Sequence, residues 1–266
     1  MTDRHVLVTG AAGGIGLACA EAFAASGDRV TGVDARADEL AAAMTAVAEG
    51  HRVVTRSLAA DLGDPHSGDL IRAAAAELGP VEVLVNAAGI YPATPLAQMT
   101  AEVWDRVQHV NVRAPVLLAV ALAAQQVPST CVVNISSGAA TRARPGAAHY
   151  CTSKAALEMA TKACAVELAA AGVRVNAVAP GFVEVDSPVN PVTSEYAVAV
   201  SANPLGRVGQ PKEIAAAVLW LASTAASFTT GAILRVDGGA TAGTTALPYH
   251  FAGATPLQHG QEEPTA

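Results

Sequence analysis

Aromatic side chains are scarce in this sequence, because they make up only 4% of its 266 residues, and charged side chains make up only 15%. Apolar residues nevertheless reach 52%, so a hydrophobic core has to be built from Ala, Val, Leu and Ile. Small aliphatic side chains of this kind suit helices that pack closely on a parallel sheet. The length allows one large α/β domain or two small ones, with a substantial core.

Long apolar runs and clusters of like charge are lacking as well. No segment approaches 18 uninterrupted apolar residues, and the opening "MTDRHVLVTG" leads into a strand without the pattern of a signal peptide. The net charge of −7 argues against a nucleic-acid surface, and without a run of like charges we expect no membrane patch. The sequence therefore predicts a cytoplasmic protein that binds neither nucleic acid nor membrane.

Metal-binding patterns are also missing. The four cysteines show no CxxC spacing, and the seven histidines show no spacing typical of metal ligands. We interpret the cysteines as buried or unreactive thiols in a reducing compartment. The sequence predicts neither a disulfide framework nor a metal site.

Short β-branched runs alternate with long alanine-rich stretches along the chain. The runs lie at residues 5–9, 29–34, 52–58, 81–86, 130–136, 173–179 and 233–238. The helical candidates between them lie at about 14–26, 37–49, 67–78, 102–126, 150–171 and 211–224. This alternation predicts repeated right-handed βαβ units, and hence an α/β fold with a doubly wound, seven-stranded parallel sheet in a single domain.

Two segments escape the alternation. Residues 181–210 form a long excursion rich in Pro and Ser, and we expect it to line a substrate pocket, because long loops in compact domains are usually functional. We place the domain at residues 1–243 and treat 244–266 as a C-terminal tail. The apolar side chains of the tail, Leu247, Tyr249 and Phe251, either dock near a pocket mouth or belong to a frayed end.

A glycine-rich turn follows the first strand in "TGAAGGIG", residues 9–16. Gly10, Gly14 and Gly16 let the chain turn sharply and bring backbone N–H groups close to a pyrophosphate at the N-terminus of a helix. The spacing differs from the commoner Gly-x-Gly-x-x-Gly. The alternative interpretation is a tight turn between a strand and a helix, with no ligand.

Further polar residues follow the next strands. Asp34 ends the second strand, where a carboxylate can accept hydrogen bonds from an adenosine ribose. Asp61 follows the third strand and "NAAG" (86–89) follows the fourth, at the edge where open α/β sheets bind ligands. Taken singly, each of these residues would more often be a cap or a turn residue.

The motifs "TGAAGGIG", "NAAG", "NISS" and "YCTSK" occur in this order. Together they resemble the short-chain dehydrogenase/reductase family in its compact one-domain form, over about residues 4–240. "NPLGRVGQPKEIA" (203–215) and "VDGG" (236–239) add to the resemblance. It implies a seven-stranded Rossmann sheet and a nicotinamide cofactor. The implied cofactor contacts are Gly10, Gly14, Ile15, Gly16, Asp34, Asp61, Leu62, Asn86, Ala87, Gly89, Tyr150, Lys154, Pro180, Gly181 and Val183.

The resemblance also implies a catalytic tetrad of Asn111, Ser137, Tyr150 and Lys154. Ser136 is the less favoured choice for the serine, because Ser137 has the family's spacing to the tyrosine. In the family the lysine also binds the ribose of the cofactor. The asparagine holds a water that connects the lysine to solvent as a proton relay.

The chemistry explains the pairing of Tyr150 with Lys154. A free phenol has a pKa of about 10, and lowering it by about three units requires roughly 4 kcal/mol of preference for the phenolate. One cation about 4 Å away, at an effective dielectric constant near 20, supplies about that much. Spacing of four residues on a helix places the lysine on the same face as the tyrosine. The serine can then hold the substrate oxygen beside the phenol.

One position departs from the family pattern. A threonine that contacts the nicotinamide carboxamide commonly follows "PG" by four residues, and here that residue is Val185. Either Ser187 takes its place or backbone groups near Val183 make the contact alone.

Three functions remain open. We favour an oxidoreductase that interconverts a small-molecule secondary alcohol and a ketone with NAD, and NADP is disfavoured because Asp34 would repel a 2′-phosphate. The second is an NADPH-dependent biosynthetic ketoreductase, such as one acting on 3-oxoacyl thioesters. The third, a non-catalytic dinucleotide-binding regulator, is disfavoured because all four tetrad residues are present.

Assembly and substrate recognition complete the predictions. Helices 102–126 and 150–171 are apolar over more of their circumference than one sheet contact needs, and equivalent helices pair between subunits in the family. We therefore expect a homotetramer. Arg142 and Arg144, in the loop before Tyr150, either recognise an acidic substrate or are solvated or in a subunit contact.

Overall fold

A computed structural model of the chain describes residues 3–185 and 203–243. Two of the predictions above fall outside these residues. They concern the tail 244–266, with Leu247, Tyr249 and Phe251, and residues 186–202 of the excursion, which include Ser187.

Seven parallel strands form one sheet in the order β3-β2-β1-β4-β5-β6-β7. Each strand overlaps one of the β-branched runs of the sequence, and the predicted α/β fold is confirmed. The bounds are β1 His5–Thr9, β2 Arg29–Asp34, β3 Thr55–Ala59, β4 Val83–Asn86, β5 Thr130–Ile135, β6 Val173–Pro180 and β7 Ile233–Val236. The strand order reverses between β1 and β4, which is where such sheets bind ligands.

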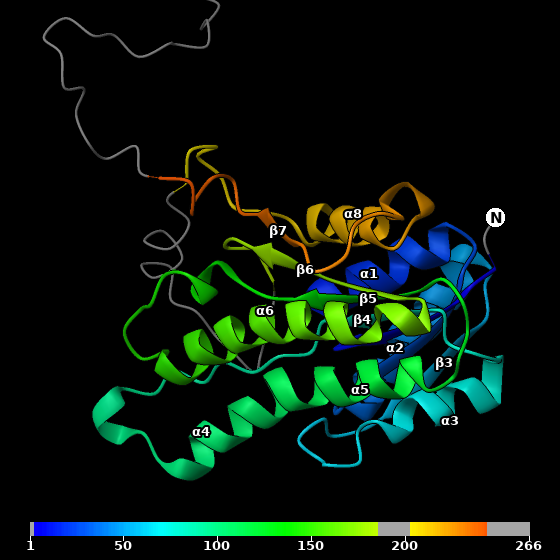
Figure 1. The fold of residues 1–266 in the computed structure, drawn as a ribbon, viewed down its shortest axis with the longest axis horizontal. Coiled ribbons are helices and arrows are strands. Elements are labelled where there is room, and N and C mark those ends of the chain that lie inside the picture. Colours follow the sequence, from blue (N-terminus) through cyan, green and yellow to red (C-terminus); the bar gives the residue numbers. More distant parts are fainter. Residues whose placement is uncertain (1–2, 186–202, 244–266) are drawn as a thin grey trace, which may run out of the picture.

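Helices cover both faces of the sheet (Figure 1). The first face carries three helices that pack side by side, namely α1 (Gly14–Ala25), α2 (Ala37–His51) and α8 (Pro211–Leu221). The second carries α3 (Asp69–Leu78), α5 (Ala114–Ala123) and α6 (Ala148–Leu168), with α4 (Ala101–Gln108) against α6. Two clusters of buried residues, built mostly from Val, Ala and Leu, lie between the sheet and these layers.

The predicted helix over 102–126 is interrupted. Between α4 and α5 lies one π-helical turn, His109–Arg113, which contains Asn111. Pro115 is the second residue of α5 and has no N–H group to donate to the carbonyl of Asn111, four residues before it. The wide turn, which the N–H of Ala114 closes on the carbonyl of His109, lies directly before this proline, and π-turns are frequent at functional sites.

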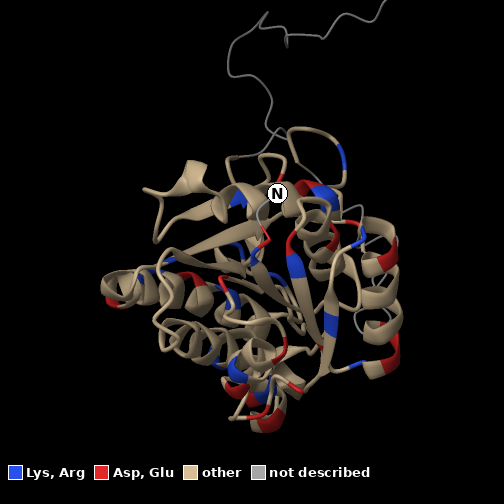
Figure 2. Ribbon diagram, turned by 90° about the vertical axis from the view of Figure 1, so that its right-hand side faces the viewer, with Lys and Arg blue, Asp and Glu red and all other residues tan. Residues whose placement is uncertain are grey.

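Charges of both signs are scattered thinly over the ribbon (Figure 2). Within residues 3–185 and 203–243, no helix is both long and apolar enough to cross a membrane.

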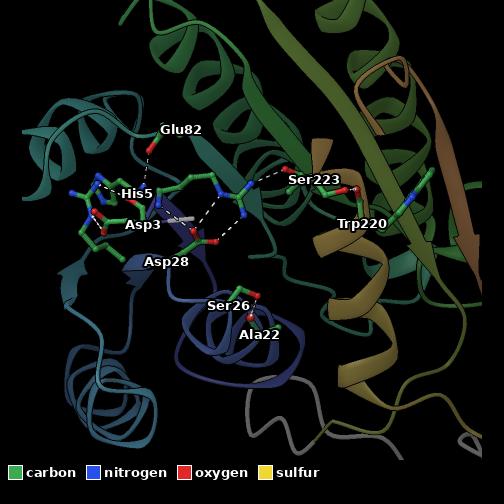
Figure 3. A network of polar contacts seen from close by, with 11 residues as sticks. Asp3, His5, Ala22, Ser26, Asp28, Glu82, Trp220 and Ser223 are labelled. Carbon is green, nitrogen blue, oxygen red and sulfur yellow. Dashed lines mark hydrogen bonds and ion pairs between the residues drawn. The ribbon is translucent and has the colours of Figure 1, made fainter. Parts of the chain in front are cut away.

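A buried ion pair connects several elements at the amino-terminal edge of the sheet (Figure 3). The guanidinium of Arg4 donates to both carboxylate oxygens of Asp28, at 3.3 and 2.8 Å, and to the carbonyl of Ala222 at 2.8 Å. The backbone N–H of Arg4 donates to Asp28 as well. Asp28 has no exposed surface. The pair therefore joins the start of β1, the α1–β2 turn and the end of α8.

We predict that Asp28→Ala lowers the free energy of unfolding by about 3–5 kcal/mol, because it leaves a largely buried guanidinium without its counter-ion. Urea denaturation measures the change. The matched control is Asp3→Ala, since Asp3 pairs with Arg29 but is 79% exposed, and it should cost less than about 1 kcal/mol. Equal effects of the two substitutions would contradict this account of the network.

Candidate active site

The residues predicted to form the site lie in loops at the carboxyl ends of the strands. The glycine turn follows β1, Asp34 ends β2, "NAAG" begins at the end of β4, Ser137 follows β5 and Gly181 follows β6. Parallel pairing places the ends of neighbouring strands beside one another, with Thr9 opposite both Val33 and Asn86. The structure therefore brings these sequence-distant segments to one edge of the sheet.

The glycine turn cannot accept side chains at two of its positions. Gly10 has φ +71°, and a Cβ there would lie 2.9 Å from the backbone of Ala88. A Cβ on Gly16 would collide with the carbonyl oxygen of Gly10. No described side chain caps the N-terminus of α1, and its first turn has no acidic residue. The turn thus has the shape and the available backbone N–H donors to hold a pyrophosphate, so the residues fit a dinucleotide.

Thr9 holds the turn against the segment after β4. Its buried hydroxyl accepts hydrogen bonds from the backbone N–H groups of Ala87 and Ala88, both at 3.1 Å. The position of the predicted cofactor residues Ala87 and Gly89 therefore depends on the last residue of β1.

Asp34 lies beside the same turn. Its carboxylate accepts hydrogen bonds from the backbone of Ala12 at 3.2 Å and of Arg36 at 3.1 Å. The side chain of Arg36 donates to it from Nε at 3.2 Å and from Nη2 at 3.3 Å. The carboxylate is thus fixed beside the glycine turn, with a guanidinium next to it.

Asp61 follows β3 and is half-exposed. Arg106 of α4 donates to both of its oxygens, at 2.8 and 3.0 Å, and the resulting hydrogen bond lowers the pKa of Asp61 below its ordinary value. The neighbouring Leu62 is buried in the core under α3 and α5. A ligand that binds Asp61 would have to share the carboxylate with Arg106.

Asn86 is only 2% exposed, and its side chain points into the fold. It donates to Asn134 of β5 at 2.8 Å, and Asn134 donates to Thr161 of α6 at 2.9 Å. The side chain of Asn86 therefore connects β4 to β5 and leaves only the backbone of this predicted cofactor residue free for a ligand.

The predicted catalytic residues meet at the start of α6. Tyr150 is 8% exposed and Lys154 is 4% exposed. The Lys154 ammonium lies 5.8 Å from the centre of the Tyr150 ring and donates to the carbonyl of Ile135 at 2.8 Å. Ser137, in the extended backbone after β5, brings its hydroxyl into interaction range of the phenol. Ser136, in contrast, donates its hydroxyl to Glu158 at 3.0 Å.

Burial dominates the electrostatics of this pair. It raises the pKa of Tyr150, and the nearby Ser137 hydroxyl and Arg144 guanidinium oppose that rise. Burial also lowers the pKa of Lys154 to about 8. The expectation that the lysine by itself makes the phenol acidic is incomplete, because it counts the charge of Lys154 and omits the cost of removing both groups from water.

Asn111 lies fully buried in the π-helical turn. Its side chain exchanges two hydrogen bonds with the backbone of Ile90, both 2.9 Å long, and donates to Ser153 of α6 at 3.0 Å. A Cβ on Gly89 would lie 3.4 Å from the Lys154 Nζ and 3.5 Å from the Asn111 Oδ1. Gly89 therefore faces both tetrad members.

The segment after β6 closes the site on its other side. Pro180 is the last residue of β6, and a Cβ on Gly181 would lie 2.8 Å from the Cα of Asp237. Val183 is buried and pairs with Gly209 in an isolated bridge. Val185 lies against the glycine turn, because its Cγ1 is 3.3 Å from the position of a Cβ on Gly14. The missing threonine is thus replaced by an apolar side chain that reaches the turn.

Sequence reasoning missed one neighbour of the phenol and left another open. Tyr91 packs on Tyr150 with 5.3 Å between the ring centres, and only Ile90 separates it from the "NAAG" segment. Its position after β4 was the available signal. The guanidinium of Arg144 lies 5.4 Å from the centre of the Tyr150 ring, whereas Arg142 turns away to donate to the carbonyl of Ala240 at 2.7 Å.

Comparison with known proteins agrees with this geometry. A family model described as "Enoyl-(Acyl carrier protein) reductase" matches residues 10–241. Galactitol 2-dehydrogenase (L-tagatose-forming) of Cereibacter sphaeroides is 40% identical over 88% of this chain and 93% of its own length. The 3-oxoacyl-[acyl-carrier-protein] reductase of Chlamydia trachomatis is 35% identical over 90% of this chain and 98% of its own.

Solved structures give the same fold with a nicotinamide cofactor in place. A blue fluorescent protein from a metagenomic library, in complex with NADPH, superimposes with a TM-score of 0.82 at 34% identity, covering 89% of this chain and 97% of its own. A 4-hydroxyisoleucine dehydrogenase complexed with NADH gives 0.78 at 28% identity, covering 91% of this chain and 100% of its own. This chain belongs to the short-chain dehydrogenase/reductase family and is a nicotinamide-dependent oxidoreductase that acts on a CH–OH group or the corresponding ketone.

Proposed function

We propose that the protein interconverts a secondary alcohol and a ketone with NAD(H) as its preferred cofactor. The observation that carries the proposal is the convergence of Tyr150, Lys154 and Ser137 at the sheet edge that also presents an uncapped helix N-terminus. The substrate is a small molecule, since the reacting groups are buried rather than spread over an open face.

The chain's own residues handle the proton and orient the substrate. A nicotinamide cofactor held by the glycine turn and Asp34 would supply the hydride acceptor for alcohol oxidation and the hydride donor for ketone reduction. The phenol oxygen of Tyr150 takes the hydroxyl proton during oxidation and gives it back during reduction. Ser137 donates a hydrogen bond to the substrate oxygen and holds it beside the phenol. Burial of the phenol excludes bulk water from the reacting atoms.

Lys154 and Asn111 form the exit for the proton. The Lys154 ammonium and the Asn111 amide oxygen both lie next to the space that a side chain at Gly89 would fill. The Asn111 oxygen accepts one hydrogen bond from Ile90 and has a second lone pair for a water. Pro115 leaves the backbone carbonyl of Asn111 without a helical donor, which supplies a second acceptor.

The excursion at 181–210 is the proposed substrate loop. Its two described ends are tied together beside the site, because Glu184 N donates to Gly209 O and Gly209 N donates to Phe182 O, both at 3.0 Å. The four cysteines are free thiols, which accords with a reducing compartment such as the cytoplasm.

Replacing Tyr150 by Phe should reduce turnover roughly 10²–10⁴-fold while the dissociation constant of the cofactor changes little, because only the phenolic oxygen is lost. Lys154→Ala should impair both turnover and cofactor binding, since the lysine lies beside the phenol and is also expected to bind the ribose. Steady-state kinetics and fluorescence titration with the reduced cofactor measure the two effects. Lys162→Ala, an exposed lysine of the same helix, is the matched control. If Tyr150→Phe keeps more than a tenth of the activity, Tyr150 is not the acid–base group.

The cofactor preference rests on Asp34. A 2′-phosphate would bring about −2 of charge near its carboxylate, and even at an effective dielectric constant of about 40 the repulsion at 4 Å is roughly 4 kcal/mol. Salt screening and the adjacent Arg36 guanidinium halve this to about 2 kcal/mol, which is still more than tenfold.

Catalytic efficiency should accordingly be more than about tenfold higher with NAD than with NADP. Asp34→Ala should narrow this ratio of efficiencies by improving the use of NADP, and Arg36→Gln should widen it by removing the guanidinium that pairs with Asp34. Initial rates with both cofactors give the three ratios. Equal efficiency of the unaltered enzyme with NAD and NADP would contradict the role of Asp34.

The second candidate is an NADPH-dependent ketoreductase. The relative named as a 3-oxoacyl reductase, the related structure with NADPH and the position of Arg36 beside the ribose site favour it. Rates with a panel of alcohols, ketones and a 3-oxoacyl thioester, each with both cofactors, separate the two candidates.

A homotetramer is the proposed assembly. Apolar side chains are exposed on two separate surfaces, one on α5 and α6 with Val120, Met159 and Val166, the other around α8 with Trp220 and Phe228. Val166 is 80% exposed and Phe228 is fully exposed. Two different self-complementary surfaces on one subunit build a tetramer with three twofold axes.

Light scattering should give four times the 26.6 kDa mass of one chain. Val166→Glu should leave a dimer, because it places a charge at the centre of one surface and spares the other. An unaltered protein with the mass of a single chain would rule out the assembly.

A further inference from the structure

The catalytic phenol faces two cations of different kinds. Lys154 comes from the same helix, with Nζ at 5.8 Å from the ring centre, and Arg144 comes from the loop before it, with Cζ at 5.4 Å. We propose that Arg144 is a positioning residue that keeps a permanent positive charge over the Tyr150 ring and thereby favours the phenolate form used in catalysis.

The loop is fixed on the carboxyl-terminal side of Arg144. Gly146 has φ +71° and accepts a hydrogen bond from the backbone of Thr94 at 2.9 Å. Ala147 donates to the carbonyl of Arg144 at 3.3 Å, and α6 begins at the next residue. The side chain of Arg144 is partly buried, and its Nε has no contact with solvent. Its charge is therefore presented from a constrained loop rather than from a free surface side chain.

The two cations respond differently to pH. Burial lowers the pKa of Lys154 to about 8, so its charge is half lost at that pH, whereas a guanidinium stays charged throughout. Burial raises the pKa of the phenol, so the phenolate forms where that ammonium has lost much of its charge. The charge of Arg144 is thus present where that of Lys154 is fading.

The other groups around the phenol do not replace Arg144. Tyr91, in the loop after β4, packs on the ring, and Cys151 is the residue after Tyr150 on α6. Both oppose ionisation and raise the pKa of Tyr150, as burial does. Ser137, from the loop after β5, and Arg144 are the described groups that lower it. Arg144 is the charged one of these two.

The contribution of Arg144 to turnover rests on the proposed function, whereas its effect on the phenol can be measured without activity. Phenolate formation is followed by ultraviolet difference absorbance, and the difference between the unaltered protein and Tyr150→Phe isolates Tyr150. Arg144→Gln should raise the titration midpoint of Tyr150 by roughly one to two pH units. Arg144→Lys should return the titration midpoint of Tyr150 most of the way to that of the unaltered protein, as long as the pH lies below the pKa of the introduced amine. Arg142→Gln, two residues away with its guanidinium turned to Ala240, should leave the midpoint unchanged.

The pH dependence of kcat/KM for alcohol oxidation is the second readout, and its lower limb should move with the titration midpoint in Arg144→Gln. An unchanged titration midpoint in Arg144→Gln overturns the proposal. If, in addition, KM rises for carboxylate-bearing substrates alone, Arg144 is an anion-recognition residue instead. If Tyr150→Phe remains active, the proposed function fails, but the titration still decides whether Arg144 stabilises the phenolate.

Discussion

The close approach of two backbone segments at the β1/β4 switch point is the constraint on which the site depends. Gly10 comes so near Ala88 that a side chain would not fit between them, and the Thr9 hydroxyl binds the N–H groups of the same segment. That contact sets where residues 87–90 lie. The backbone N–H of Ile90 then donates a hydrogen bond to the side chain of Asn111, and Asn111 donates one to Ser153 on α6. A chain of short polar contacts thus runs from the glycine turn to the helix that carries Tyr150 and Lys154.

Burial gives this site its chemistry and also opposes it. A phenol and an ammonium within the fold are shielded from water, which strengthens every interaction between them and the substrate. The same burial disfavours both charged forms, so the phenolate needs support from more than its helical partner. The groups that supply it, Ser137 and Arg144, both come from the connection between β5 and α6 and not from the helix. The reactivity of Tyr150 is therefore a property of the sheet edge and not of the YxxxK motif alone.

Much of this could be predicted from the sequence because it has local causes. Runs of Val and Ile between alanine-rich stretches indicated all seven strands, and the glycine turn was identified by its place between β1 and α1. The prediction was less successful where long-range contacts decide. The inward orientation of Asn86 depends on Asn134, which is 48 residues away. The π-helical turn needed the combined effect of Pro115 and the contacts of Asn111. The distance from Arg144 to the phenol depends on the path that the loop before α6 takes along the sheet edge.

The ion pair of Arg4 and Asp28 has a consequence for the engineering of this enzyme. It lies at one end of β1 and the glycine turn lies at the other, about 20 Å apart at the usual rise of a strand. Substitutions separated by more than about 10 Å, with no shared partner, combine additively. Substitutions that strengthen the contacts at the amino-terminal edge can therefore raise the free energy of unfolding without altering the site. The added stability can offset the cost of substitutions that change substrate specificity at the opposite edge.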